Sequence, residues 1–222
     1  MNDTIIRELT INGVDIRLEA GQDAIGELNT LIGKLKPVAD GFPKPPDVRP
    51  PSRDLDLLDA GFASKVKGVL ALCNKKGHPM RPFFTLRTVW TQARLWRQSR
   101  PTHEIQKAIQ KLKQEGAPFL AYVLDAVGPQ HGRWATNALP GQSWHQWGLA
   151  VDCFAIGMNG RAVWSASFPS YKVYADAAQE FGLVPGYYWR RKDTVHVQAE
   201  MDGVRQTKTW PEIDAKMQDL FA

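Results

Sequence analysis

The sequence predicts an α+β fold, in which helices flank a small antiparallel sheet and an N-terminal ββα unit precedes the main domain. Three features support this prediction. Apolar residues alternate on both sides of Asn12-Gly13, which is typical of a β-hairpin. Apolar residues recur at helical spacing from residue 55 onward, and short strand-like segments lie between them. The 222 residues are enough for one buried core and a smaller appendage.

Residues 1–36 are expected to form the appendage. Its second strand ends near Leu18, and Asp23 can cap a following helix. A unit this small is marginally stable alone, because domains below about 40 residues usually need staples or partners. The apolar positions of the expected helix are Ile25, Leu28, Ile32 and Leu35.

Residues 37–54 separate the appendage from the main domain and are rich in proline. Proline lacks a backbone donor and favours extended polyproline geometry over a packed core. We interpret this stretch as a semi-rigid linker. The alternative is an ordered arm that lies along the main domain.

Residues 55–222 are expected to form the main domain. Amphipathic patterns predict helices around residues 62–73, 105–112 and 171–178. Gly182 suits the position that follows the third helix. The remaining expected elements are a helix from Thr209-Trp210-Pro211 to Phe221 and three strands, PFFTLRT (82–88), LAVDCFAI (149–156) and TVHVQAE (194–200).

The composition is that of a folded globular protein, with 43% hydrophobic and 23% charged residues. No apolar run of about 18 residues occurs, and the N-terminus lacks the basic and apolar regions of a secretory signal. We therefore expect synthesis in the cytoplasm without a signal peptide, and no stable membrane insertion. The net charge of +5 favours contact with polyanions, among which nucleic acid, anionic lipid and bacterial wall polymer all qualify.

The most informative stretch runs from Ser143 to Asp152, because it joins the imidazole of His145 and a carboxylate across a glycine. Gly148 and Asp152 share one face of the expected strand, whereas His145 has the opposite parity. A turn or bulge at Gly148 would be needed to bring His145 beside Asp152, and glycine permits one.

These two residues could hold a metal ion if a third ligand is available. Zinc in hydrolases typically takes three protein ligands from His, Asp and Glu and keeps a fourth position for water. His196 is the best remaining candidate, because it interrupts a strand-like sequence three residues after Asp193. The other histidines lie in turn contexts or at the start of an amphipathic helix, and HExxH is absent: His78, His103 and His131.

Three blocks of the sequence resemble one family of zinc peptidases, which comprises D-alanyl-D-alanine carboxypeptidases (VanY-like) and L-alanyl-D-glutamate endopeptidases, including phage endolysins. Residues 136–152 resemble the family signature SxHxxGxAxD and its lead-in. Residues 87–100 are similar to the family's arginine-glutamine block, and residues 193–196 fit its DxxH. The blocks occur in the family's order over roughly residues 55–200.

This resemblance implies a Zn²⁺ site and assigns roles around it. Zinc would bind to His145, Asp152 and His196. Asp193 would act as the general base, and Arg87 would bind the developing oxyanion. The chemistry agrees, because zinc lowers the pKa of its bound water toward about 7 and a neighbouring carboxylate can then take the proton.

Three further residues are candidates for contact with the substrate: Ser143, Gln92 and Trp147. Each has a structural alternative. Ser143 could be a simple cap or turn hydroxyl, and Gln92 could tie the helix after Arg87 to the site. Trp147, like Trp144, could belong to the core or to the wall of a substrate groove.

The chain departs from the family pattern in two places. Residues 182–189 lack the acidic residue of the GLEWGG-like turn that endopeptidases of this kind carry. Residues 101–132 form a longer segment than a minimal member needs, and their helix could roof the cleft or contact a partner.

The expected function is zinc-dependent hydrolysis of peptidoglycan stem peptides by a monomer. The aspartate of DxxH favours an L-alanyl-D-glutamate endopeptidase, as in endolysins, and a D-alanyl-D-alanine carboxypeptidase is the close alternative. A non-catalytic cell-wall-binding or virion structural module is the alternative of another class. A nucleic-acid binder rests on charge alone, so we expect no nucleic acid. Release through a phage membrane pore would bring such an enzyme to the cell wall.

Overall fold

The structure is a computed structural model that describes residues 6–11, 14–19, 41–48 and 50–222. The chain forms two compact units, Met1–Pro43 and Lys44–Ala222. Within the described ranges, no helix is long and apolar enough to cross a membrane.

The N-terminal unit contains an antiparallel hairpin. Strand β1 (Ile6–Ile11) pairs with β2 (Val14–Glu19). The register places Ile11 opposite Val14, which agrees with the hairpin that the alternating pattern predicts. The turn expected at Asn12-Gly13 and the helix expected after Asp23 lie outside the described residues.

The main domain is built on a small antiparallel sheet, which confirms the α+β prediction. The strand order is β3-β4-β7-β6, and β5 also pairs with β4. Asp152 of β4 lies opposite Phe84 of β3 on one side and His196 of β7 on the other. The strands are β3 (Met80–Phe84), β4 (Ala150–Ile156), β5 (Ala162–Val163), β6 (Val184–Pro185) and β7 (His196–Gln198).

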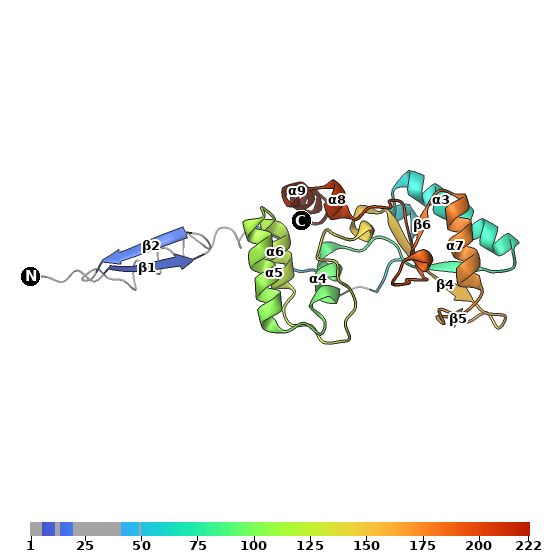
Figure 1. Cartoon of the computed structure of the whole chain (residues 1–222), viewed down its shortest axis with the longest axis horizontal. Helices are drawn as coiled ribbons and strands as arrows, with labels where there is room; N and C mark the ends of the chain where they lie inside the picture. Colours follow the sequence, from blue (N-terminus) through green and yellow to red (C-terminus); the bar gives the residue numbers. More distant parts are fainter. Residues whose placement is uncertain (1–5, 12–13, 20–40, 49) are drawn as a thin grey trace, which may run out of the picture. The chain divides into compact units, whose positions relative to one another are not determined.

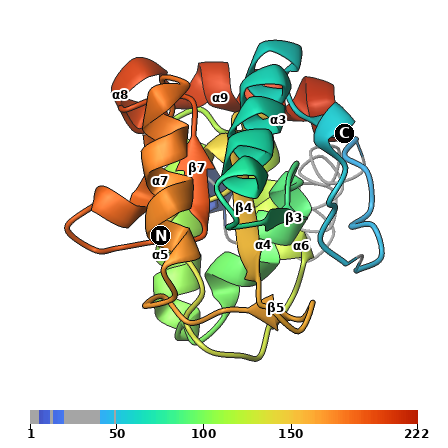
Figure 2. The ribbon, with the colours of Figure 1, turned by 90° about the vertical axis from the view of Figure 1, so that its right-hand side faces the viewer.

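Helices α3 (Ala60–Lys75) and α7 (Ser170–Glu180) cover one face of the sheet (Figure 2). Alternate residues of β4 point into this core, namely Val151, Cys153 and Ala155. Asp152 therefore points to the opposite face, toward the side on which the remaining helices lie (Figure 1). Those helices are α4 (Val89–Arg97), α5 (Thr102–Gln114), α6 (Pro118–Ala126), α8 (Val204–Thr207) and α9 (Trp210–Phe221).

The helices predicted from periodicity in the main domain are present in the structure, and Gly182 follows α7 with φ +68°. Helix α6 was not anticipated. Its sequence PFLAYVLDA is apolar nearly all round, so it lacks the contrast between faces that marks an amphipathic helix. Five of its residues are buried for the same reason: Phe119, Leu120, Ala121, Val123 and Leu124.

Two backbone carbonyls of the proline-rich stretch bind residues of the main domain. The Ser52 carbonyl accepts hydrogen bonds from the backbone N–H of Thr85 at 2.8 Å and from its hydroxyl at 3.1 Å. The Pro46 carbonyl accepts one from Arg94 at 2.5 Å. Pro46 and Ser52 are thus hydrogen-bonded to residues of the main domain.

Candidate metal centre

His145 reaches the site through a tight turn. It lies in a short 3₁₀ helix, Trp144–Trp147, that Ser143 and Gln146 begin with a capping box. Gly148 ends this helix with φ +69°. A side chain there would also bring a Cβ within 3.1 Å of the Asp59 nitrogen, so glycine is needed for both conformation and space. The turn predicted at Gly148 is present.

His145, Asp152 and His196 come together on the face of the sheet that α3 and α7 leave open. One potential ligand atom from each residue lies within 4.8 Å of the others. The strand register brings Asp152 and His196 together, because these two residues are directly paired. The turn at Gly148 brings His145 to the same place.

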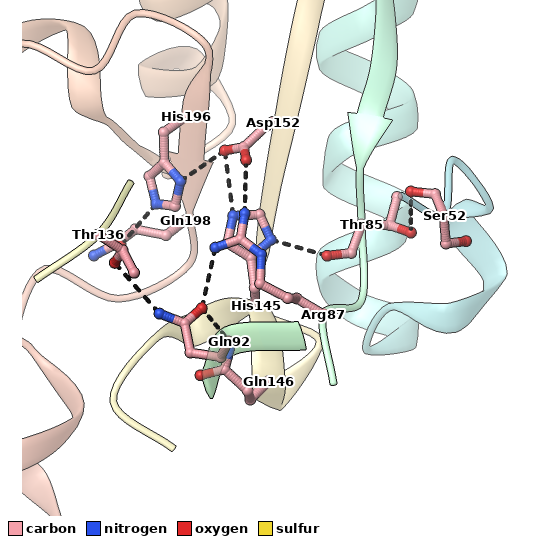
Figure 3. Close-up of polar contacts among 10 residues, drawn as sticks. All are labelled: Ser52, Thr85, Arg87, Gln92, Thr136, His145, Gln146, Asp152, His196 and Gln198. Carbon is pink, nitrogen blue, oxygen red and sulfur yellow. Dashed lines mark hydrogen bonds and ion pairs between the residues drawn. The ribbon is translucent and has the colours of Figure 1, made fainter. Parts of the chain in front are cut away.

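The hydrogen bonds of His145 define its tautomer. Nδ1 lies 2.8 Å from the Thr85 carbonyl oxygen, which can only accept, so Nδ1 carries the proton. In the neutral ring Nε2 then carries a lone pair. That atom lies 3.2 Å from Oδ1 of Asp152 (Figure 3). Burial lowers the pKa of His145, which favours this neutral form.

The hydrogen bonds of His196 lead to the same result with the opposite nitrogen. The Gln198 amide nitrogen donates to the Glu200 carbonyl, so its oxygen is the acceptor that faces Nε2 of His196 at 3.0 Å. Nε2 therefore donates, and Nδ1 is left to face Oδ1 of Asp152 at 3.0 Å (Figure 3). Both rings are held by a hydrogen bond on the far side, as is usual for histidines that bind metals.

This arrangement fits a cation. Two imidazole nitrogens converge on one carboxylate oxygen, and a proton or a metal ion is required between them. Burial alone would raise the pKa of Asp152, but His145 and His196 outweigh it and hold that pKa well below its usual range. Burial alone would lower the pKa of His196, but the hydrogen bond and the charge of Asp152 outweigh this effect, so the pKa of His196 is raised. A nitrogen, nitrogen and oxygen set of this kind suits Zn²⁺.

Arg87 lies against the metal residues. It donates to Oδ2 of Asp152 at 3.2 Å, and its guanidinium lies 4.3 Å from the centre of the Phe84 ring. Its other terminal nitrogen donates to Gln92 at 3.2 Å. Burial lowers the pKa of Arg87, although Asp152 and Asp193 oppose this, and a guanidinium stays charged in any case.

Asp193 lines the same cavity at the turn before β7. Its backbone N–H donates to the Gly186 carbonyl at 3.0 Å. A Cβ on Gly186 would lie 2.6 Å from the Asp193 oxygen, so the glycine permits this close approach. Burial raises the pKa of Asp193, although His196 lowers it in part. A raised pKa brings a carboxylate closer to the range in which it exchanges protons with water.

The other predicted contacts divide between the cavity and its support. Ser143 lines the cavity, whereas Gln92 is fully buried behind Arg87 and does not. Gln92 donates to the Ala138 carbonyl at 2.7 Å and ties Arg87 to that loop, as its structural alternative proposed. Trp147 also lies outside the lining, with its indole nitrogen on the Gly141 carbonyl at 3.0 Å. Neither Gln92 nor Trp147 is among the residues that line this cavity.

Several residues of the site carry no clear signal in the sequence. Thr85 orients His145 across 60 positions of chain, which no local pattern indicates. Trp189 lies 5.2 Å from the His196 ring, measured between centroids, and comes from the turn that departs from the family pattern. Gln198 could have been found, because it lies two positions after His196 and so shares its strand face.

The site opens into a cavity of about 730 Å³. No residue of the segment 101–132 is among the residues that line it, so the helices of that segment do not roof the site. Its walls come from the proline-rich stretch, from β3 and α4, from the 3₁₀ helix and the loop before it, and from β7 and its flanking loops. Besides the residues described above, they are Pro51, Phe83, Phe84, Leu95, Ala135, Thr136, Ala138, Gln142, Trp144, Trp189, Gln198, Met201 and Gly203.

A family model described as VanY, D-alanyl-D-alanine carboxypeptidase, matches residues 56–201. No curated protein sequence matches the chain. The L-Ala D-Glu endopeptidase ChiX of Serratia marcescens is 18% identical, with a TM-score of 0.37 over 68% of this chain and 89% of that one.

Two further solved structures are similar at comparable levels. The LD-carboxypeptidase LdcB is 15% identical, with a TM-score of 0.41 over 73% of this chain and 64% of that one. A vancomycin-resistance D,D-pentapeptidase, VanY from a VanB-type cassette in complex with Zn(II), is 18% identical, with a TM-score of 0.39 over 73% and 78%.

Zinc binding is expected to weaken as the pH falls. The raised pKa of His196 means that a proton competes for the place between His196 and Asp152, and this competition grows below the folded-state pKa. Calorimetric titration of metal-free protein should give one zinc per chain, with lower affinity at pH 6 than at pH 8.

The same zinc titration on variants tests whether His145, Asp152 and His196 form the binding site. Asp152→Asn should lower the affinity at least about 100-fold, because even outer-shell partners of a metal site contribute 10–100-fold. His131→Ala, at an exposed histidine, is the matched control and should bind zinc normally. Equal affinities for Asp152→Asn and the parent protein would rule out this metal site.

Proposed function

The chain belongs to the VanY family of D-alanyl-D-alanine carboxypeptidases and is a zinc peptidase of peptidoglycan peptides, and on that premise we propose that it cuts an internal bond of the stem peptide. The bond we propose is that between L-alanine and D-glutamate. The sequence supports this choice through the aspartate of Asp193-Thr194-Val195-His196. One observation about the cavity carries it.

Among the residues that line the cavity in the described part of the chain, Arg87 is the only lysine or arginine. Its guanidinium is already bound to Asp152 and Gln92. A carboxypeptidase has to recognise the free carboxylate at the end of its substrate, which is most simply done by a cation. The absence of a second cation among these lining residues favours a substrate that continues on both sides of the cleaved bond.

Zinc held by His145, Asp152 and His196 would polarise the peptide carbonyl and lower the pKa of water. Asp193 is the residue we assign to take the proton from the attacking water and to pass it to the leaving amine. It lines the cavity and is accessible from it, and its raised pKa suits both steps.

Arg87 has two tasks in this proposal. One N–H of each terminal nitrogen is used on Asp152 or Gln92, and each nitrogen carries a second N–H. The bond to Asp152 orients a metal ligand. The second N–H groups can donate to the carbonyl oxygen as negative charge develops there, an effect worth roughly 3–4 kcal/mol for donors of this kind.

We also assign Ser143 to substrate contact, because it lines the cavity beside His145. The proposed partner is peptidoglycan, and we propose that the protein binds it as a monomer. Nucleic acid is not a partner in this proposal. Action at the cell wall, reached as an endolysin reaches it, is part of the same proposal.

Product analysis separates the proposed reaction from its alternative. Incubation with muropeptides should yield a new L-alanine carboxyl end and a peptide that begins with D-glutamate, as read by mass spectrometry. Release of free D-alanine as the main product would instead identify a D-alanyl-D-alanine carboxypeptidase, the activity that the family description names. No product with zinc-loaded protein would favour a non-catalytic wall-binding module.

Asp193→Asn should lower kcat by about 100-fold or more, because general acid–base groups contribute 10²–10⁴-fold. Zinc content should stay at the parent level, since the amide keeps the size of the side chain and Asp193 is not in the triad. Asp202→Asn, at an exposed aspartate in the loop after β7 that does not line the cavity, is the control. Asp193→Asn with full activity would exclude this residue as the base.

A further inference from the structure

A half-exposed aromatic surface continues from the wall of the metal cavity. Phe83 lines the cavity, and the ring of Trp164 packs edge-on against it with centroids 4.9 Å apart. Trp164 also lies 5.3 Å from Phe154, measured between centroids. Phe154 follows Asp152 by two positions on β4 and so points to the same face of the sheet. The surface formed by these three rings, here the aromatic platform, is thus an extension of the site along the sheet.

The platform is held in place by the fold. Trp164 directly follows β5, whose Val163 pairs with Ala155 of β4. The hydroxyl of Tyr171, a fully buried residue, donates to the Val163 carbonyl at 2.7 Å. Trp164 is nevertheless 50% exposed, and its ring covers Phe83 and Phe154 rather than entering the core. A large ring fixed at the surface beside a catalytic cavity is typical of a recognition residue.

A free guanidinium borders the platform. The Cζ of Arg53 lies 5.6 Å from the centre of the Phe154 ring. Arg53 is exposed, and it has no ion-pair or hydrogen-bond partner among the described residues. Aromatic faces offer an apolar, electron-rich surface, while the guanidinium offers several N–H donors to oxygen. This combination suits a ligand that has a flat C–H face and oxygen atoms around its edge.

We propose that the aromatic platform binds an N-acetylated amino sugar of the glycan strand from which the stem peptide extends. Resting on the proposed function, this places the peptide in the cavity and the attached sugar on the neighbouring platform. The pyranose C–H groups would pack on the Trp164 ring, and Arg53 would donate to hydroxyl or acetamido oxygens. The site would then distinguish a peptide attached to sugar from a free peptide. L-alanine is the stem residue nearest the sugar, so cleavage after L-alanine would keep the sugar close to the cavity.

The first test compares two substrates with the full-length zinc-loaded protein. Trp164→Ala should raise KM at least about 10-fold for a stem peptide attached to its disaccharide, and leave kcat/KM for the free peptide unchanged. Trp164→Phe should recover part of the loss. Met158→Ala is the matched control, because Met158 is fully exposed in the connection between β4 and β5, on the other side of β5 from Trp164 in the sequence. Arg53→Gln should give a smaller rise in KM of the same selectivity.

The second test does not depend on catalysis. Binding of a soluble N-acetylglucosamine oligomer is followed by NMR, through the indole signals of the tryptophans. The Trp164 signal should shift when the oligomer is added, and Trp164→Ala should no longer bind the oligomer. Sugar binding without peptide cleavage would keep the platform and overturn the proposed reaction. Equal losses on both substrates, or no sugar binding by the parent protein, would overturn the platform. A concentration-dependent dimer abolished by Trp164→Ala would assign the surface to a second copy of the chain instead.

Discussion

Two imidazole nitrogens that face one carboxylate oxygen impose the main constraint on this structure. Each histidine has its other nitrogen occupied by a partner that can only accept: the Thr85 carbonyl for His145 and the Gln198 amide oxygen for His196. The inner nitrogens therefore present lone pairs to Asp152, and only a proton or a cation relieves that contact. All three side chains are largely buried, so bulk water has little access to solvate the facing lone pairs and the carboxylate.

The surrounding structure serves to hold that contact. On one side, the Ser52 carbonyl of the proline-rich stretch binds both donors of Thr85, which in turn orients His145 (Figure 3). On the other side, Gln92 receives N–H groups from Arg87 and Gln146, and so joins the second oxygen of Asp152 to the 3₁₀ helix that carries His145. Ser52 is therefore part of the support of the site.

The sequence predicts those parts of the site that depend on local rules. The parity of β4 and the glycine at 148 anticipate how His145 and Asp152 meet, and the spacing of Asp193 and His196 indicates the second strand. It does not predict the supports, because Thr85 and Ser52 act across long separations and use backbone groups, which every residue has. Substrate contact was expected of Gln92 and Trp147, and neither lines the cavity, since residue type alone does not distinguish a buried amide or indole from an exposed one. Helix α6 was missed because its apolar residues occupy all faces.

The nitrogen atoms that bind zinc test this account most directly. A crystal structure of the zinc-loaded protein, with the ion located by anomalous scattering, would identify them. The account predicts one ion bonded to Nε2 of His145, to the Asp152 carboxylate and to Nδ1 of His196, with the Thr85 and Gln198 hydrogen bonds intact. An ion bound through Nε2 of His196, or held by residues outside this triad, would contradict it.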